Sequence, residues 1–179
     1  MSLLSVRKFP DSALKQVALA VQEITPATLR LIDDMVETMY AAPGVGLAAP
    51  QVGVAQRIIV LDTDYENPRR KLVKLINPVV RGRAGEVVWE EGCLSVVDFT
   101  AEVKRAAWVE VVGLNEKGKE IKIEGEDLLA VVLQHEIDHL DGILFIDRIS
   151  RLKRDLYTRR LKKRLREGRT TPERPQLMI

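Results

Sequence analysis

The six residues Gln134-His135-Glu136-Ile137-Asp138-His139 carry the strongest structural signal in this chain. Two histidines four residues apart lie one above the other on a helix, where both rings can bind one metal ion. A carboxylate one residue after the first histidine can reach a metal-bound water without coordinating the metal itself. The pattern therefore predicts a helix that carries a catalytic metal site, with His135 and His139 as ligands and Glu136 beside the water.

The flanks of this motif favour a buried helix. Residues 128–133 read Leu-Leu-Ala-Val-Val-Leu, and Gly142 stands where a C-terminal cap would end the helix. A helix that is apolar on every side is buried, and each unpartnered polar side chain on it would cost about 1–3 kcal/mol. A metal ion supplies partners for the histidines. Two hydrogen-bonded core histidines remain an alternative on this motif alone.

A third protein ligand has to come from elsewhere, because the chain contains only two histidines. Asp141 and Asp147 lie downstream, but neither belongs to a second helical motif. The only cysteine, Cys93, lies in the glycine-containing turn Glu91-Gly92-Cys93-Leu94-Ser95. One thiolate with two imidazoles leaves the fourth position of a metal site open for water. Considered alone, Cys93 is better explained as a small buried hydrophobic residue, as most free cysteines are.

Three segments follow one another along the chain: Gly44-Val45-Gly46-Leu47-Ala48-Ala49-Pro50-Gln51, Glu91-Gly92-Cys93-Leu94-Ser95 and Gln134-His135-Glu136-Ile137-Asp138-His139-Leu140. Together they resemble the peptide deformylase family, in the same order and with similar gaps, from the N-terminus to about residue 148. The resemblance implies an enzyme that removes the formyl group from the N-terminal formyl-methionine of nascent polypeptides and releases formate. The implied substrates and partners are formyl-methionyl peptides.

The resemblance also implies the residues of the metal centre. Cys93, His135 and His139 would hold one divalent metal ion, and Glu136 would act first as general base and then as general acid. Thiolate and imidazole suit both zinc and iron(II). The family resemblance implies Fe(2+) in the cell, with Zn(2+), Ni(2+) or Co(2+) in purified protein.

Further roles implied by the resemblance concern the substrate. Gln51 and the backbone N–H of Leu94 would stabilise the oxyanion, although a glutamine after Pro50 is otherwise an ordinary turn residue. Glu91 would pair with Arg105 to support the cysteine loop. The residues implied to contact the peptide or line its methionine pocket are Gly44, Val45, Gly46, Trp89, Leu128, Val131 and Val132. On residue type alone, a core position is the better explanation of each aliphatic in this set.

The glycine segment has a physical reason of its own. Gly44 and Gly46 let backbone approach a ligand closely, so this segment can pair with an extended peptide as an added strand. A phosphate-binding loop is disfavoured because no lysine follows. The chain departs from many bacterial members of the family after the cysteine motif, where it has Ser95-Val96-Val97 instead of Ser-Ile-Pro and Thr100 where some carry arginine. This loop borders the family's substrate groove, so the departures bear on substrate affinity.

The rest of the chain predicts an α+β fold with β-strands wrapped around the central metal-binding helix. Thr25-Pro26 predicts the start of an N-terminal helical segment that continues to about Met39. Runs rich in valine and isoleucine predict strands at 57–61, 71–76, 86–90, 103–114 and 119–124, with a hairpin turn at 115–118. At 179 residues the chain is expected to form one catalytic domain over residues 1–169, followed by a disordered tail at 170–179.

Residues 150–168 have a different composition, with nine lysines and arginines against two acidic residues. Leu152, Leu156, Leu161 and Leu165 form a partial apolar stripe, which predicts a basic C-terminal helix docked by its leucines. Its basic face is either solvated or in contact with ribosomal RNA near the emerging nascent chain. The formal net charge of +2 is too small to indicate DNA binding by the chain as a whole.

Composition also bears on the compartment. A single cysteine cannot form an intramolecular disulfide, and the first ten residues contain no apolar run typical of a signal peptide. No segment approaches the roughly 20 apolar residues that cross a membrane. The expected localisation is therefore cytoplasmic, with no membrane partner.

Two other classes of function stay open on the sequence. The chain could be a metallohydrolase that acts on a different acyl group, or a binding protein that keeps the fold without the chemistry. Against the second stands the joint presence of Cys93, His135, His139, Glu136 and Gln51. A protein without catalysis has no need of all five.

Overall fold

The computed structural model describes residues 2–42, 44–64 and 66–168. Within them the helices are α1 (Pro26–Ala41), α2 (Asp127–Leu140) and α3 (Arg151–Arg166). The strands are β1 (Gly46–Ala48), β2 (Ile58–Leu61), β3 (Val73–Ala84), β4 (Val87–Cys93), β5 (Val96–Arg105), β6 (Trp108–Leu114) and β7 (Glu120–Glu126). Short 3-10 turns lie at Ser12–Lys15, Ala49–Val52 and Phe145–Asp147.

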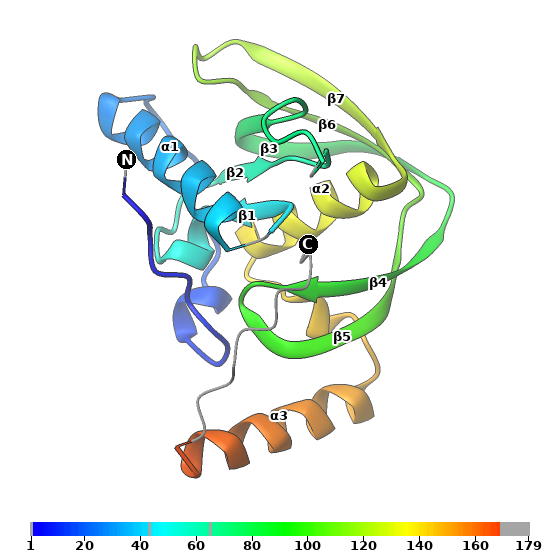
Figure 1. The fold of residues 1–179 in the computed structure, drawn as a ribbon. Coiled ribbons are helices and arrows are strands. Elements are labelled where there is room, and N and C mark those ends of the chain that lie inside the picture. The colour runs from blue at the N-terminus through cyan, green and yellow to red at the C-terminus, as the bar shows by residue number, and fades with distance from the viewer. Residues whose placement is uncertain (1, 43, 65, 169–179) are drawn as a thin grey trace.

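The strands form two antiparallel sheets around helix α2. The larger sheet has the order β1-β2-β3-β6-β7, and the smaller is the β4–β5 hairpin. Helix α2 lies between the two, with α1 beside the β1 edge of the larger sheet and α3 below the hairpin (Figure 1). The predicted α+β fold, with strands around a central helix, is confirmed.

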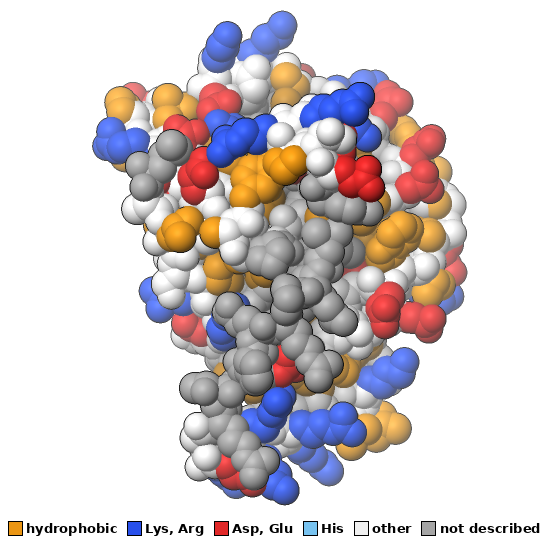
Figure 2. Space-filling model, in the orientation of Figure 1, with side chains coloured by type: hydrophobic (Ala, Val, Ile, Leu, Met, Phe, Trp, Pro, Cys, Tyr) orange, Lys and Arg blue, Asp and Glu red, His pale blue; other side chains and the backbone are white. Residues whose placement is uncertain are grey.

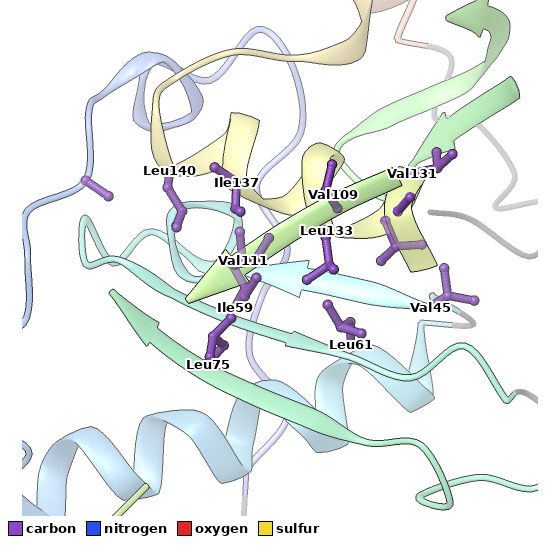
Figure 3. Packing of buried hydrophobic residues seen from close by; sticks show 14 residues of the cluster. Val45, Ile59, Leu61, Leu75, Val109, Val111, Val131, Leu133, Ile137 and Leu140 are labelled. Atoms are coloured by element: carbon purple, nitrogen blue, oxygen red, sulfur yellow. The ribbon is translucent and has the colours of Figure 1, made fainter. Parts of the chain in front are cut away.

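The main core lies where α2 packs on the larger sheet (Figure 3). Every residue from Ala130 to Leu140 is buried, as the apolar flank of the motif predicts. Val131, Leu133 and Ile137 of α2 belong to one cluster with residues of β2 and β6, among them Ile59, Leu61, Val109 and Val111. Burying one such side chain contributes about 1.5–3 kcal/mol, so this contact fixes α2 firmly against the sheet.

Capping residues mark the start of α1 and the end of α2. Thr25 accepts a hydrogen bond from the backbone N–H of Thr28 at the start of α1, as expected from Thr25-Pro26. Helix α2 ends at Leu140, and Gly142 follows two residues later with a φ of +71°. The N–H of Ile143 donates to the Asp138 carbonyl at 2.9 Å, and the N–H of Gly142 to that of His139. This Schellman motif stops the helix just beyond the second histidine.

The structure corrects the expected strand at 103–114. That segment is two strands in two different sheets, because β5 ends at Arg105 and β6 begins at Trp108. At the break, Ala106 donates its N–H to Gln134 Oε1 and accepts from Gln134 Nε2, both at 3.0 Å. A side chain of α2 thus replaces the strand partner at this point. Valines lie on both sides of the break, at position 103 and at positions 109, 111 and 112, and they give no sign of it.

Helix α3 is present, but Leu161 is the one residue of the predicted leucine stripe that is buried. Tyr157 and Leu161 are its buried residues, whereas Leu152, Leu156 and Leu165 are exposed by 70%, 45% and 59%. An aromatic residue, Tyr157, takes the place that the stripe assigned to Leu156. The tail predicted at 170–179 lies outside the described residues. Among the helices that are described, none combines the length and the apolar character needed to span a membrane.

Candidate metal centre

Three side chains from two elements meet at one buried point. Cys93 is the last residue of β4, and His135 and His139 are one turn apart on α2. Their exposed fractions are 1%, 2% and 1%, and one ligand atom of each lies within 4.8 Å of the others. Cys93 Sγ is 3.3 Å from His139 Nε2. The fold therefore brings together the three residues that the sequence suggested as ligands.

Several polar atoms at this point have no hydrogen-bond partner among the described residues. They are His135 Nε2, His139 Nδ1 and both carboxylate oxygens of Glu136, all buried. Buried polar atoms in folded proteins are nearly always partnered, so such a cluster calls for a missing partner. A thiol and two imidazoles are the donors that zinc and ferrous iron prefer. The residues present thus fit a divalent metal ion with Glu136 beside it.

Burial shifts the protonation of these groups. It raises the pKa of the Cys93 thiol to about 12, and it raises the pKa of Glu136 well above its ordinary range. Burial also lowers the pKa of His139 well below its ordinary value, which keeps that imidazole in the neutral form that binds metals. A bound dication deprotonates a coordinating thiol, so the metal and the thiolate would stabilise each other.

A carboxylate holds the first histidine. His135 Nδ1 lies 2.8 Å from Glu91 Oε2, and Glu91 in turn accepts from Arg105 Nε and Nη2 at 2.6 and 2.9 Å. Burial alone would raise the pKa of Glu91, but the hydrogen bonds from Arg105 and His135 lower it to about 2. An ionised Glu91 accepts a hydrogen bond from the Nδ1–H group, which leaves the lone pair of His135 Nε2 available to a metal.

This network continues beyond Arg105 through contacts that the sequence did not suggest. Arg105 Nη1 donates to Asp138 Oδ2 at 2.5 Å, and Arg148 donates to both oxygens of Asp138. Asp138 lies between the two histidines in the sequence, but no spacing rule links it to these partners. Arg148 is ten residues further on, a spacing that corresponds to no helical contact, and it follows the turn after Gly142.

The structure places Gln51 beside the cysteine. Its Oε1 accepts from the N–H of Ala48 at 2.8 Å, and its Nε2 points toward Ser95 Oγ at 3.1 Å and Cys93 Sγ at 3.5 Å. Ser95 also donates its backbone N–H to the cysteine sulfur at 3.4 Å, a contact that the sequence did not suggest. Leu94 lies between Cys93 and Ser95 in the same turn, 9% exposed.

The glycine segment lies directly against these residues. A Cβ atom on Gly46 would lie 2.4 Å from Glu136 Oε1, and one on Gly44 would lie 2.8 Å from Leu94 Cδ1. Glycine at position 46 is therefore the condition for Glu136 to occupy its place. Strand β1, which contains Gly46, is an edge strand among the described residues, since it pairs only with β2.

The residues suggested for a methionine pocket lie in or beside the main core. Val45, Val131 and Val132 are buried members of that cluster, at 2% exposure or less. Trp89 and Leu128 are partly buried and pack against it. The structure thus gathers all five into one apolar region next to the metal centre's helix.

Buried thiol and imidazole donors around one point, with a carboxylate beside them, define the class of metal-dependent hydrolases. The chain matches the family model for polypeptide deformylase over residues 3–155. It belongs to the peptide deformylase family and is a hydrolase that removes the N-formyl group of nascent polypeptides.

Individual relatives agree with this assignment. The chain is 52% identical to a peptide deformylase of Thermodesulfovibrio yellowstonii, over 90% of this chain and 98% of that one. It is 50% identical to a peptide deformylase of Syntrophobacter fumaroxidans, over 94% of this chain and 99% of that one. The crystal structure of a Legionella pneumophila peptide deformylase superposes with a TM-score of 0.87 at 42% identity, covering 96% and 100% of the two chains. The crystal structure of the Ehrlichia chaffeensis peptide deformylase in complex with actinonin superposes with a TM-score of 0.86 at 37% sequence identity. The match covers 93% of this chain and 99% of that one.

Proposed function

We propose that this chain deformylates formyl-methionyl peptides at a metal ion held by Cys93, His135 and His139. The observation that carries the proposal is the buried cluster of ligand atoms together with the unpartnered imidazole and carboxylate atoms around it. When bound there, a divalent ion acts as a Lewis acid and lowers the pKa of a water molecule from 15.7 toward about 7. Residues 1–169 form the single catalytic domain of this proposal.

Glu136 moves the protons. Both its oxygens lack a partner among the described residues, and burial raises its pKa well above the ordinary range. A carboxylate of raised pKa is a stronger base at neutral pH. It accepts a proton from the attacking water and then delivers one to the amine nitrogen, which leaves only when protonated.

Gln51 and Leu94 stabilise the negative charge that develops on the formyl oxygen. Gln51 Nε2 already points to the cysteine side of the site, and Ala48 holds its Oε1 in place. The backbone N–H of Leu94 is the second donor. Removing one such donor costs roughly 3–4 kcal/mol of transition-state stabilisation in comparable sites.

The peptide binds as an added strand along β1. Gly46 lies on the sheet edge next to Glu136, so a strand paired there would bring its N-terminal end to the metal centre. Gly44 permits the close approach, and Val45, Trp89, Leu128, Val131 and Val132 supply apolar surface for the methionine side chain. The Thr100 and Val97 departures bear on the affinity of this groove.

The test of this function is a comparison of two substrates. Formate release from a formyl-Met tripeptide is expected to exceed acetate release from the acetyl-Met tripeptide by several orders of magnitude, with metal-loaded protein. Equal rates, or faster release of acetate, would assign the site to another acyl substrate.

Gly46→Ala is expected to lower formate release by about 10- to 100-fold, because the new methyl group displaces the Glu136 carboxylate by a fraction of an ångström or more. Gly82→Ala is the control. The three atoms nearest to its Cβ belong to the Trp108 ring and to Glu110, at 3.0 Å or more. Steady-state kinetics of formate release and the metal content are measured for both variants. Equal activity of the two would contradict the role of Gly46.

Ferrous iron is the proposed metal in the cell. A ferrous ion with a thiolate ligand is prone to oxidation of either partner by oxygen. Iron-loaded protein is therefore expected to lose most of its activity within hours in aerated buffer, while nickel-loaded protein keeps it. Undiminished activity of the iron form in air would argue against iron. The reaction takes place in the cytoplasm, where nascent chains emerge.

The basic face of α3 is proposed to contact ribosomal RNA. Its exposed cations are Arg151, Lys153, Arg159, Arg160, Lys162, Lys163 and Arg166. Figure 2 shows lysine and arginine side chains gathered at the lower end of the molecule, where α3 lies in Figure 1. Clustered cations of this kind bind phosphate backbones by releasing counterions.

Neutralising four of these residues tests the contact. Glutamine at Lys153, Arg159, Lys162 and Arg166 is expected to abolish co-sedimentation with ribosomes at low salt while leaving formate release unchanged. The matched control replaces four exposed cations elsewhere, Arg81, Arg83, Lys117 and Lys119. If both variants co-sediment like the unaltered chain, α3 does not contact the ribosome.

A further inference from the structure

Five side chains form a continuous series from the surface to the metal centre. Arg148 binds Asp138, Asp138 binds Arg105, Arg105 binds Glu91, and Glu91 binds His135. Side-chain exposure falls along this series from 37% at Arg148 to 10% at Asp138 and 2% at Arg105, and it is 0% at Glu91 and 1% at His135. The series thus links a solvent-facing guanidinium to the imidazole that we propose as a ligand.

The charges along the series alternate and cancel. Arg148 and Arg105 are cations. The anion Asp138 lies between these two arginines, and the anion Glu91 lies between Arg105 and His135. Asp138 Oδ2 is shared by both guanidiniums, while its Oδ1 is bound by Arg148. A guanidinium that contacts both oxygens of a carboxylate fixes its plane as well as its position. Arg148 therefore holds Asp138 in the orientation that directs Oδ2 at Arg105.

The outer end of the series borders a cavity of about 290 Å³. Arg105, Asp138 and Arg148 line it, together with Arg83, Lys104 and residues of the helix end. Without Arg148, the Asp138 carboxylate has room to turn into this space. Arg105 would then lose one of its three bonds to carboxylates, and its position would depend on its two bonds to Glu91 alone.

We infer that Arg148 is a positioning residue for the metal centre, acting through Asp138, Arg105 and Glu91 on the tautomer and orientation of His135. The inference rests on the proposed function, because it takes His135 as a ligand. Outer partners of a metal-binding histidine commonly change metal affinity or activity by about 10- to 100-fold when they are removed. Arg148 is further from the ligand than most such partners, so its effect is expected at the lower end of that range.

The first test measures zinc loss. Zinc-loaded protein is mixed with excess chelator, and the release rate is followed for the unaltered chain, Arg148→Gln, Arg148→Lys and Arg83→Gln. We expect release about 10-fold faster from Arg148→Gln. Arg148→Lys should lie between, because an ammonium keeps the charge but cannot fix both oxygens in one plane. Arg83→Gln removes a cation from the same cavity without touching the series, and its rate should stay within about twofold of the unaltered chain.

The second test needs no metal. In metal-free protein labelled with nitrogen-15, the His135 imidazole is expected to carry its proton on Nδ1, which donates a hydrogen bond to Glu91, and Arg148→Gln should give a mixture of tautomers. Unfolding midpoints of all variants serve as the check on folding. If Arg148→Gln releases zinc at the same rate as the unaltered chain and keeps the same His135 tautomer, the inference is overturned. An unaltered chain that binds no zinc would instead contradict the proposed function itself.

Discussion

Glu136→Gln is expected to lower formate release from a formyl-Met tripeptide by about 10²- to 10⁴-fold, the usual contribution of general acid–base catalysis. The amide has nearly the same shape as the carboxylate, so it fits beside Gly46, but it cannot accept the proton of the attacking water. Because Glu136 is not among the three clustered ligand residues, bound metal should stay at one ion per chain. Rate and metal content are measured on the same preparation.

Asp141→Asn is the matched control for this change. Asp141 follows the last residue of α2, and its side chain pairs with Arg57 at the surface, 46% exposed. The control should keep full activity. A Glu136→Gln variant as active as this control would remove Glu136 from the mechanism, whereas loss of activity together with loss of metal would make it a structural residue.

Arg105→Gln is expected to lower the free energy of unfolding by roughly 3–5 kcal/mol, the cost of leaving a buried charge without its partner. The guanidinium is 2% exposed and lies against Glu91, which is 0% exposed. In this variant Asp138 still pairs with Arg148, so Glu91 is the carboxylate that loses its cationic partner. Urea denaturation of the metal-free protein measures the change.

The neighbouring residue supplies the control. Lys104 pairs with Glu86, but both side chains are more than 60% exposed, at 71% and 62%. Lys104→Gln should therefore change the unfolding free energy by less than about 0.5 kcal/mol. Equal denaturation midpoints for Arg105→Gln and Lys104→Gln would show that the buried pair adds nothing to stability.

What the sequence predicted correctly depends on local spacing. The i and i+4 histidines, the Thr25-Pro26 helix start and the Gly142 cap all lie within one or two turns of the residues they affect, and the structure has each of these features as expected. Cys93 was indicated only by the order of three motifs, because no spacing rule links the last residue of β4 to a histidine more than forty residues later.

What the sequence could not predict depends on contacts between distant elements. The break at Ala106 arises because Gln134 of α2 binds its backbone, and the valines on either side give no sign of it. Arg148 and Asp138 meet because the turn at Gly142 folds the chain back. On α3 the spacing of apolar residues predicted that the leucines would be buried. The surface that α3 contacts contains Phe99, and the Tyr157 ring stacks on the Phe99 ring with 4.6 Å between their centroids.

The measurement that tests the central claim most directly is an X-ray absorption spectrum of the zinc-loaded chain at the zinc edge. Ligation by Cys93, His135 and His139 predicts one sulfur at about 2.3 Å and two imidazole nitrogens at roughly 2.0–2.1 Å, with a light atom completing the shell. Cys93→Ser should lose the sulfur contribution. A spectrum without sulfur, or one that Cys93→Ser leaves unchanged, would contradict the account.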